Sequence, residues 1–184
     1  MTSRTLSKEK IIAAAIELIN EQNNLTFTNL GKKLGTKSQS IYNYYPDVLA
    51  VKIAVAISFY HDLKYKLQTD LLGLSGKEAV IKFCETSVSF QLSKYLVTQE
   101  VFSIPSGKIN SKELDRSALD VHDILIKLLT PLEANEKIRL ILARTLRNLI
   151  TGEVIHVGNG RFSDELVSAK ESFDYMLANT LNAY

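Results

Sequence analysis

The apolar residues of this chain recur at helical spacing from near its start to its end, and this pattern is the strongest limit on its fold. Ile11, Ala15, Leu18 and Ile19, for example, share one face of a predicted helix that Ser7 can cap. No stretch of the sequence shows a sustained alternation of apolar and polar residues, which is the pattern of a half-buried strand. We therefore expect an all-α protein.

Glycine, proline and asparagine divide the chain into successive helices. Gly35 is suited to end a helix in the left-handed conformation, and Pro46 and Pro131 block the continuation of two others. Pro105 opens a predicted turn that runs to residue 108. Further helices are expected after the first one, and they run from Thr26 or Phe27 to Gly35, from Ser38 to Tyr45, from Asp47 to Leu72, from Lys77 into the nineties, from Ser111 to Thr130, from Glu133 or Asn135 to Val157, and onwards from Ser163. Ser163 would cap the last of them, and Asp164 and Glu165 are favourably placed at the positive end of its dipole.

Composition excludes several classes of protein. The chain has 184 residues, 46% of them hydrophobic, which is enough to build a core and argues against intrinsic disorder. Cys84 is the only cysteine, so a disulfide scaffold is excluded. The segment Met1–Thr5 lacks the apolar stretch of a signal peptide, and apolar runs are far shorter than the ~20 residues that cross a bilayer. We expect a cytoplasmic protein with no membrane partner.

The formal net charge of +2 is unevenly distributed. Residues 1–46 carry a net charge of +3 and residues 47–184 a net charge of −1. An excess of positive charge at one end of a chain indicates a surface that faces nucleic acid, although a solvated basic face has the same composition. The cations of the first segment are Arg4, Lys8, Lys10, Lys32, Lys33 and Lys37.

Residues 26–45 have the layout of a helix-turn-helix. Two short predicted helices are joined by a tight turn that contains Gly35, and Leu30, Leu34 and Ile41 are the apolar contacts that would hold them together. The second helix must then present polar side chains outwards, while Ile41 and Tyr45 face inwards. Its outward residues are Lys37, Ser38, Gln39, Ser40, Tyr42 and Asn43.

Each outward side chain suits a contact with DNA. Gln39 and Asn43 can pair with the adenine edge in the major groove, and Ser40 can address a donor or an acceptor there. Lys37, with Lys32 or Lys33, can supply the salt-dependent attraction to phosphate. Neutral donors that can fix the register on phosphate oxygens are Thr28, Ser38, Tyr42 and Tyr44. A small helical bundle with a polar surface would give the same pattern without binding DNA.

The run Phe27-Thr-Asn-Leu-Gly-Lys-Lys-Leu-Gly-Thr, followed by Ile41-Tyr-Asn-Tyr-Tyr, resembles the signature of the tetracycline-repressor (TetR) family of bacterial transcriptional regulators. The resemblance covers roughly residues 7–60. It implies that Thr28 meets phosphate, that Lys37 to Ser40 begin the recognition helix, and that Tyr42, Asn43 and Tyr44 close the contact surface.

The chain departs from the family pattern at three positions. Val48 stands where a lysine is usual, and Lys52 lies too far along the chain to be an assured substitute. Tyr44 replaces a common histidine. Gly31 replaces a common alanine, at a cost in helix propensity of about 1 kcal/mol.

The resemblance also implies a second domain for dimerisation and ligand binding, so we predict domains at residues 1–46 and 47–184. The last two long helices would pair with those of a second subunit, although the same apolar stripes could be core within one chain. The residues expected at the dimer interface are Leu149, Gly152, His156, Phe173, Met176 and Leu177.

A cavity between the middle helices is implied for a small-molecule effector whose identity the sequence does not give. Its expected lining is apolar with a few polar anchors, as in most ligand pockets, and any helical core would have the same composition. The candidates are Phe59, Phe83, Ser87, Phe90, Gln91, His122 and Leu125.

No residues with catalytic or metal-binding spacing stand out. His61, His122 and His156 lie far apart in the sequence, and Cys84 is best interpreted as a buried thiol. We therefore expect no cofactor, no metal site and no enzymatic activity. The predicted function is a ligand-responsive repressor that binds a palindromic operator as a dimer. The alternative is a TetR-like coactivator or adaptor that acts through protein contacts without recognising DNA.

Overall fold

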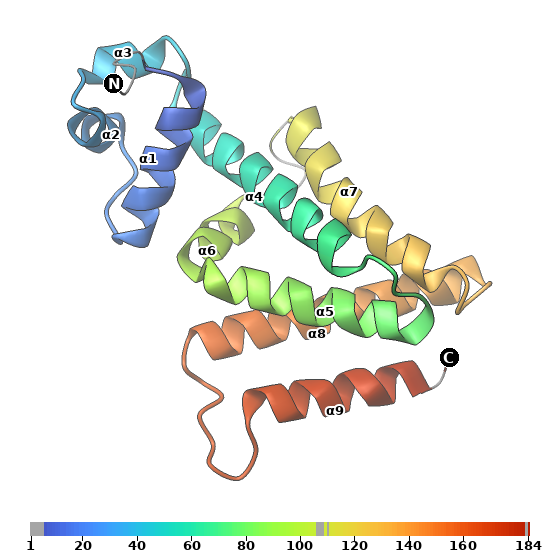
Figure 1. Cartoon of the computed structure of the whole chain (residues 1–184). Coiled ribbons are helices and arrows are strands. Elements are labelled where there is room, and N and C mark those ends of the chain that lie inside the picture. The colour runs from blue at the N-terminus through green and yellow to red at the C-terminus, as the bar shows by residue number, and fades with distance from the viewer. Residues whose placement is uncertain (1–5, 106–108, 110, 183) are drawn as a thin grey trace. The chain divides into compact units, whose positions relative to one another are not determined.

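A computed structural model describes residues 6–105, 109, 111–182 and 184 of the chain. Over these residues it contains nine α-helices and no strand (Figure 1), which confirms the all-α class that the hydrophobic periodicity predicts. None of the helices in this described part is both long and apolar enough to cross a membrane. The helices are α1 (Lys8–Asn20), α2 (Phe27–Leu34), α3 (Ser38–Tyr42), α4 (Val48–Asp70), α5 (Gly76–Ser93), α6 (Tyr95–Ser103), α7 (Lys112–Leu129), α8 (Glu136–Gly158) and α9 (Ala169–Asn182).

The helices form two compact units. Unit 1 takes in the described residues of 1–61 and 96–117, and unit 2 those of 62–95 and 118–184. Helices α4 and α7 each contribute residues to both units. The functional boundary predicted between residues 46 and 47 is a different division of the chain and stays a prediction.

The start of unit 1 is built as the sequence pattern requires. The Ser7 hydroxyl oxygen accepts a hydrogen bond from the Lys10 N–H and caps α1. Thr26 caps α2 in the same way through the Asn29 N–H. The predicted inner face of α1 is buried, and Leu30 and Ile41 are fully buried beneath it, so α1, α2 and α3 share one small core.

Two glycines shape the turn between α2 and α3. Gly35 has a φ of +63°, the left-handed conformation that ends a helix. Gly31 is needed for a different reason, because a Cβ there would lie 2.9 Å from the Thr36 carbonyl oxygen and 3.1 Å from the Ser38 nitrogen. The loss of helix propensity at Gly31 therefore accompanies a close approach of the turn to α2, which an alanine would obstruct.

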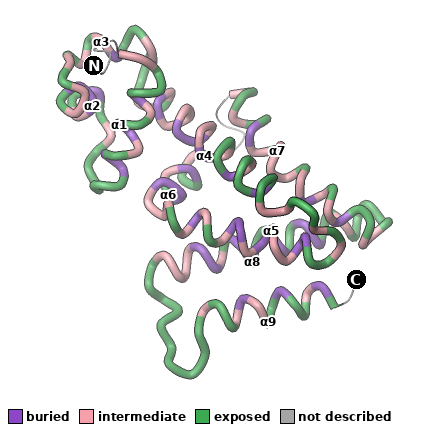
Figure 2. The backbone as a smooth tube through the Cα atoms, viewed as in Figure 1, coloured by how far each residue is buried: buried purple, intermediate pink, exposed green. Residues whose placement is uncertain are grey.

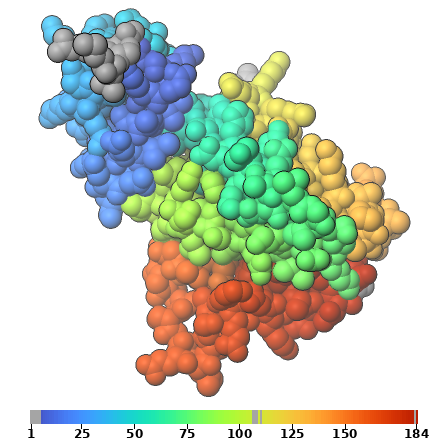
Figure 3. Space-filling view, viewed as in Figure 1, coloured from blue at the N-terminus to red at the C-terminus, as the bar shows by residue number. Residues whose placement is uncertain are grey.

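In unit 2, α8 packs against both α5 and α9. The buried residues of α9 are Phe173, Leu177 and Leu181, a stripe at helical spacing (Figure 2). The Tyr95 ring lies against Gly158, where a Cβ would overlap it, so the end of α8 depends on a residue without a side chain. The segment between α8 and α9 stands out from the helices that flank it, and its residues 159–168 are exposed (Figure 3).

The structure corrects two of the predictions for the helices. Helix α6 is not foreseen, because no glycine or proline separates it from α5; the break falls at Lys94, whose φ and ψ are −124° and 39°. Helix α3 ends at Tyr42, three residues early. The predicted turn at 105–108 lies outside the described residues after Pro105.

The predicted cap of the last helix at Ser163 is wrong. The Ser168 hydroxyl accepts from the Glu171 N–H, and α9 begins at Ala169. Leu166, which the sequence places on the apolar stripe of this helix, is 92% exposed. A helix begun at Ser163 would bury nothing in its first turn, so the later cap is favoured.

Candidate nucleic-acid interface and ligand groove

Helix α3 divides its side chains between core and solvent as a recognition helix must. Ile41 and Tyr45 are buried, whereas the side chains predicted to read bases project from the opposite face. Tyr42 is 53% exposed, and its ring edge meets Phe27 of α2 with centroids 4.6 Å apart. This contact orients Tyr42 on the surface. Thr28, Lys37, Gln39 and Asn43 are exposed, and Ser38 and Ser40 are partly exposed.

The predicted phosphate donor Tyr44 is already engaged. Its hydroxyl donates a 2.7 Å hydrogen bond to the carbonyl oxygen of Leu6, and the side chain is partly buried. A phenol has one proton to donate, so Tyr44 in this arrangement anchors the segment before α1 instead of offering that proton to phosphate.

The basic residues of the interface differ in availability. The Lys33 ammonium lies 2.6 Å from Glu21 and 3.0 Å from Glu17, and the hydrogen bond to Glu21 raises the lysine pKa. The charge of Lys33 is thus compensated by two glutamates within unit 1, whereas Lys32 and Lys37 are exposed. Arg4, which contributes to the predicted +3, lies outside the described residues.

Lys52, which the sequence does not make an assured substitute for the lysine missing at Val48, is also paired. Lys52 on α4 forms a 2.8 Å ion pair with Glu100 on α6, inside unit 1. Asp47 instead caps α4, because its carboxylate accepts from the Ala50 N–H at 2.7 Å. The first turn of α4 is therefore capped by Asp47, and neither position 48 nor position 52 provides an unpaired lysine.

The residues predicted to bind an effector lie on α4, α5 and α7. Phe59 belongs to unit 1 and the other six to unit 2. Phe83, Ser87, Gln91 and Leu125 are buried, and Phe90 and His122 are partly exposed. Burial lowers the pKa of His122, with a further contribution from Arg147. Their joint role as an effector site stays a prediction.

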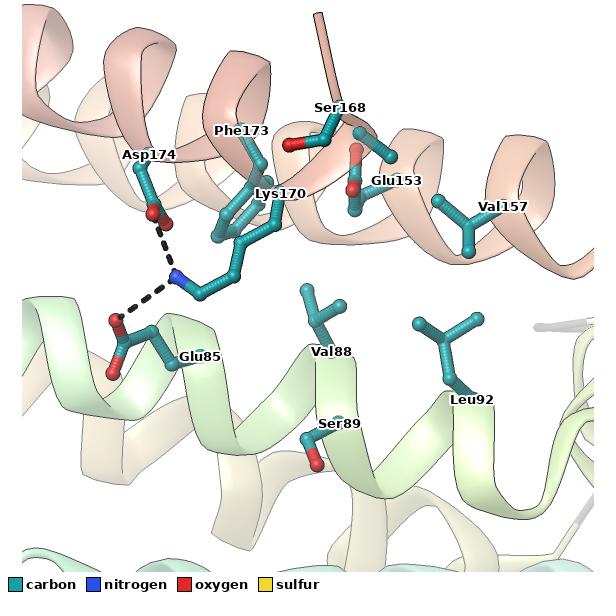
Figure 4. A pocket seen from close by; sticks show the side chains of 11 residues that line it. Glu85, Val88, Ser89, Leu92, Glu153, Val157, Ser168, Lys170, Phe173 and Asp174 are labelled. Atoms are coloured by element: carbon teal, nitrogen blue, oxygen red, sulfur yellow. Dashed lines mark hydrogen bonds and ion pairs between the residues drawn. The ribbon is translucent and has the colours of Figure 1, made fainter. Parts of the chain in front are cut away.

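Unit 2 contains a groove of about 660 Å³ that this prediction did not foresee (Figure 4). It lies among α5, α8 and α9, and none of the seven predicted effector residues lines it. Its apolar walls come from Val88 and Leu92 on α5, Val157 on α8, and Ala169 and Phe173 on α9. Its polar lining is Glu85, Ser89, Glu153, Ser168, Lys170 and Asp174.

Glu153 is the unusual member of this lining. Its side chain is on the buried face of α8, at 5% exposure, and among the described residues its Oε2 atom has no hydrogen-bond partner. Burial raises the pKa of the Glu153 carboxyl, and the negative charge of Asp174 adds to the effect. The signal in the sequence was a charged residue at helical spacing from Leu146 and Ile150, a face that otherwise reads as core.

The predicted dimer residues fall into two groups. Leu149, Gly152, His156 and Met176 retain exposure in the single chain. Phe173 and Leu177, at 3% and 2% exposure, belong to the core of unit 2 and offer almost no surface to a second subunit. The stripe that they mark packs α9 onto its own chain, and a place for these two residues at a dimer interface stays a prediction.

The thiol of Cys84 is inaccessible. It is fully buried on α5, and burial raises its pKa to about 12, so it stays protonated and unreactive at neutral pH. In the described part of the chain no three His, Cys, Asp or Glu side chains are grouped so that they could hold a metal ion.

No protein-family model and no curated protein sequence matches this chain. Solved structures do match over nearly its whole length. A protein of unknown function from Rhodococcus sp. RHA1 is 13% identical, with a TM-score of 0.81 over 99% of this chain and 97% of that one. A TetR variant from Acinetobacter baumannii AYE in complex with minocycline is 18% identical, with a TM-score of 0.70 over 97% of this chain and 96% of that one.

A possible TetR family transcriptional regulator from Streptomyces coelicolor A3(2) is 12% identical, with a TM-score of 0.72 over 96% of this chain and 98% of that one. The chain has the TetR fold. In that fold α1, α2 and α3 are the helix-turn-helix and its supporting helix, which agrees with the resemblance seen in residues 7–60. At these identities the likeness concerns the fold, and function has to be argued from the side chains.

Proposed function

We propose that this protein is a TetR-like transcriptional regulator that binds DNA through α3. The observation that carries the proposal is the division of α3 into a buried face and a polar face. Ile41 is held fully buried, while Gln39 and Asn43, four residues apart, are both exposed on the polar face. Amide side chains so placed match the donor and acceptor pattern of adenine in the major groove.

Neutral donors would carry much of the phosphate contact. Thr28 is exposed near the start of α2, and Ser38 and Tyr42 are accessible on α3. With Lys33 held by two glutamates, Lys37 and Lys32 are the candidates for the salt-dependent attraction. Each head would then bind weakly, and a dimer would be needed to reach a useful affinity.

The regulator would act as a homodimer on a palindromic operator, with half-sites about 34–36 Å apart. Leu149, Gly152, His156 and Met176, which keep exposure on α8 and α9, are the surface that supports a dimer. A small-molecule effector would favour a state in which the two α3 helices no longer match the half-sites, and so release the operator. Repression is the simplest sign, because a dimer bound over a promoter blocks polymerase. The site of action would be the cytoplasm.

A gel shift tests the proposal. The full chain would be titrated against DNA that flanks its own gene, at ~50 mM salt, with an unrelated duplex of equal length as the control. Binding that is selective for the flanking DNA and weakens as salt is raised supports the regulator. Equal affinity for both duplexes, or no shift at ~50 mM salt, would overturn it.

One observation favours the alternative of an adaptor that acts without DNA recognition. Val48 replaces a usual lysine, and Lys33 and Lys52 are both held in ion pairs inside unit 1. The same gel shift separates the two functions, because an adaptor gives no selective shift.

A further inference from the structure

We propose that the groove among α5, α8 and α9 binds an amphipathic organic cation, in which a protonated amine meets the Glu153 carboxylate and an apolar body fills the groove. The proposal rests on the proposed function only in taking this groove as the effector site. Binding itself can be measured without DNA.

The size and walls of the groove fit an organic molecule. A volume of about 660 Å³ is within the range of ~300–1,000 Å³ that holds drug-sized ligands. Figure 4 shows Val88 and Leu92 extending from α5 towards Glu153 and Val157 on α8, with Phe173 of α9 beside them. These side chains offer an apolar surface on both sides of the one buried carboxylate.

The charge of the groove favours a ligand that carries a positive charge. Its lining holds three carboxylates, of Glu85, Glu153 and Asp174, and one ammonium, of Lys170. The lysine is taken by two of the carboxylates, since its Nζ lies 2.6 Å from Asp174 and 4.0 Å from Glu85. An anion would therefore meet a surplus of negative charge, whereas a cation would reduce it.

Glu153 supplies the specific contact. A buried carboxylate oxygen without a donor is costly, and an ammonium N–H is the donor that compensates best for its lost water. The raised pKa of Glu153 has the same origin, because nothing in the groove yet stabilises the charged form. A bound ammonium would do so and would keep Glu153 ionised.

A purely structural role explains this residue less well. At a position that faces Val88 and Phe173, a leucine or glutamine would fill the space without a buried charge. A second copy of the chain is the other possible occupant of an open groove, and the dependence of amine binding on protein concentration tests for it.

Isothermal titration calorimetry on the full chain tests the proposal with three probes of the same shape: 4-phenylbutylamine, 4-phenylbutan-1-ol and 4-phenylbutanoate. We expect the amine to bind at least tenfold more tightly than the alcohol at pH 7, and the carboxylate to bind most weakly. Equal affinity for amine and alcohol, or no heat from the amine at ~10 mM, overturns the proposal. Because no DNA is present, that failure leaves the proposed regulator untouched.

Two variants place the site. Glu153→Gln should weaken amine binding about tenfold and change alcohol binding less than twofold. Glu171→Gln is the matched control, because Glu171 is an exposed residue of α9 that does not line the groove. An equal loss in both variants would mean that general charge, and not this groove, attracts the amine. Amine binding that vanishes as protein concentration rises would assign the groove to a second copy. If Glu153→Gln does not fold, crystals soaked with the amine decide by whether its nitrogen lies within hydrogen-bond distance of Glu153.

Discussion

The helix-turn-helix of unit 1 and the groove of unit 2 are two candidate binding regions that are constructed differently. The first keeps its polar side chains exposed on α3 and holds Lys33 and Lys52 in ion pairs with glutamates. The second places one carboxylate, Glu153, in a buried apolar setting with an oxygen left unpaired. The first arrangement suits a large, hydrated, highly charged partner such as DNA. The second suits a small partner that can be taken out of water.

Among the substitutions considered, one on the buried face of α3 should have the largest effect, and the effect should be on stability. Ile41→Ala removes a fully buried side chain from α3, the helix that packs against α2, and is expected to cost about 2–5 kcal/mol in the free energy of unfolding. Urea denaturation followed by circular dichroism measures it. Gln39→Ala is the control on the same helix and should change stability by less than ~0.5 kcal/mol. Similar losses in both variants would show that α3 lacks the division of faces described here.

The reading face should show its effect in binding. Gln39→Ala is expected to relax the base preference at one position of each half-site, with a cost of about 1–3 kcal/mol for a lost bidentate contact. Binding to a library of operator variants, selected and sequenced, measures the preference. A profile identical to that of the wild type would remove Gln39 from the set of residues that read bases.

The buried carboxylate of the groove should lower stability at neutral pH. The pKa of Glu153 in the folded chain lies above its ordinary value of 4.5, so folding favours the protonated form. The stability of the wild type is therefore full below that ordinary value and declines as pH rises through the folded-state pKa.

Glu153→Gln removes this decline. We expect the variant to be more stable than the wild type at pH 8 and to lose the advantage near pH 4. Thermal melts at the two pH values, with Glu171→Gln as control, measure the difference. A variant that is less stable at pH 8 would mean that the charge of Glu153 is compensated within the fold.

Substitutions of Lys37 and Lys33 in unit 1 should have the smallest effect on DNA binding, and they compare an exposed lysine with one held in an ion pair. Lys37→Gln is expected to lower the slope of log affinity against log salt by about 1 per head, because one phosphate contact is lost. Lys33→Gln should leave the slope unchanged, because that ammonium is held by Glu17 and Glu21. Fluorescence anisotropy with labelled operator at several salt concentrations distinguishes them. Equal changes in slope would contradict the ion pairs as the reason for the difference.

The helix-turn-helix could be predicted closely because its determinants are local. Ser7 and Gly35 act on residues close to them in the chain, and the cap of α1 and the left-handed end of α2 appear where the sequence places them. Tyr44 shows the limit of this reasoning, since its partner Leu6 is 38 residues away. No pattern within α3 indicates that its hydroxyl is already used.

The groove could not be predicted because it arises where three distant helices meet. Val88, Glu153 and Phe173 come from three different helices, and only the packing of α5, α8 and α9 brings them around one space. The prediction of where α9 begins was wrong for a related reason. The predicted cap was Ser163, whereas the helix that buries Phe173, Leu177 and Leu181 is capped at Ser168.

The central claim is that α3 binds DNA with few charged contacts, and the salt dependence of operator binding by the wild-type protein tests it most directly. With about two phosphate-contacting lysines per head, the slope of log affinity against log salt should be roughly −3 to −4 for the dimer. Selective binding with that shallow slope is the predicted result. Absence of selective binding at ~50 mM salt would contradict the account.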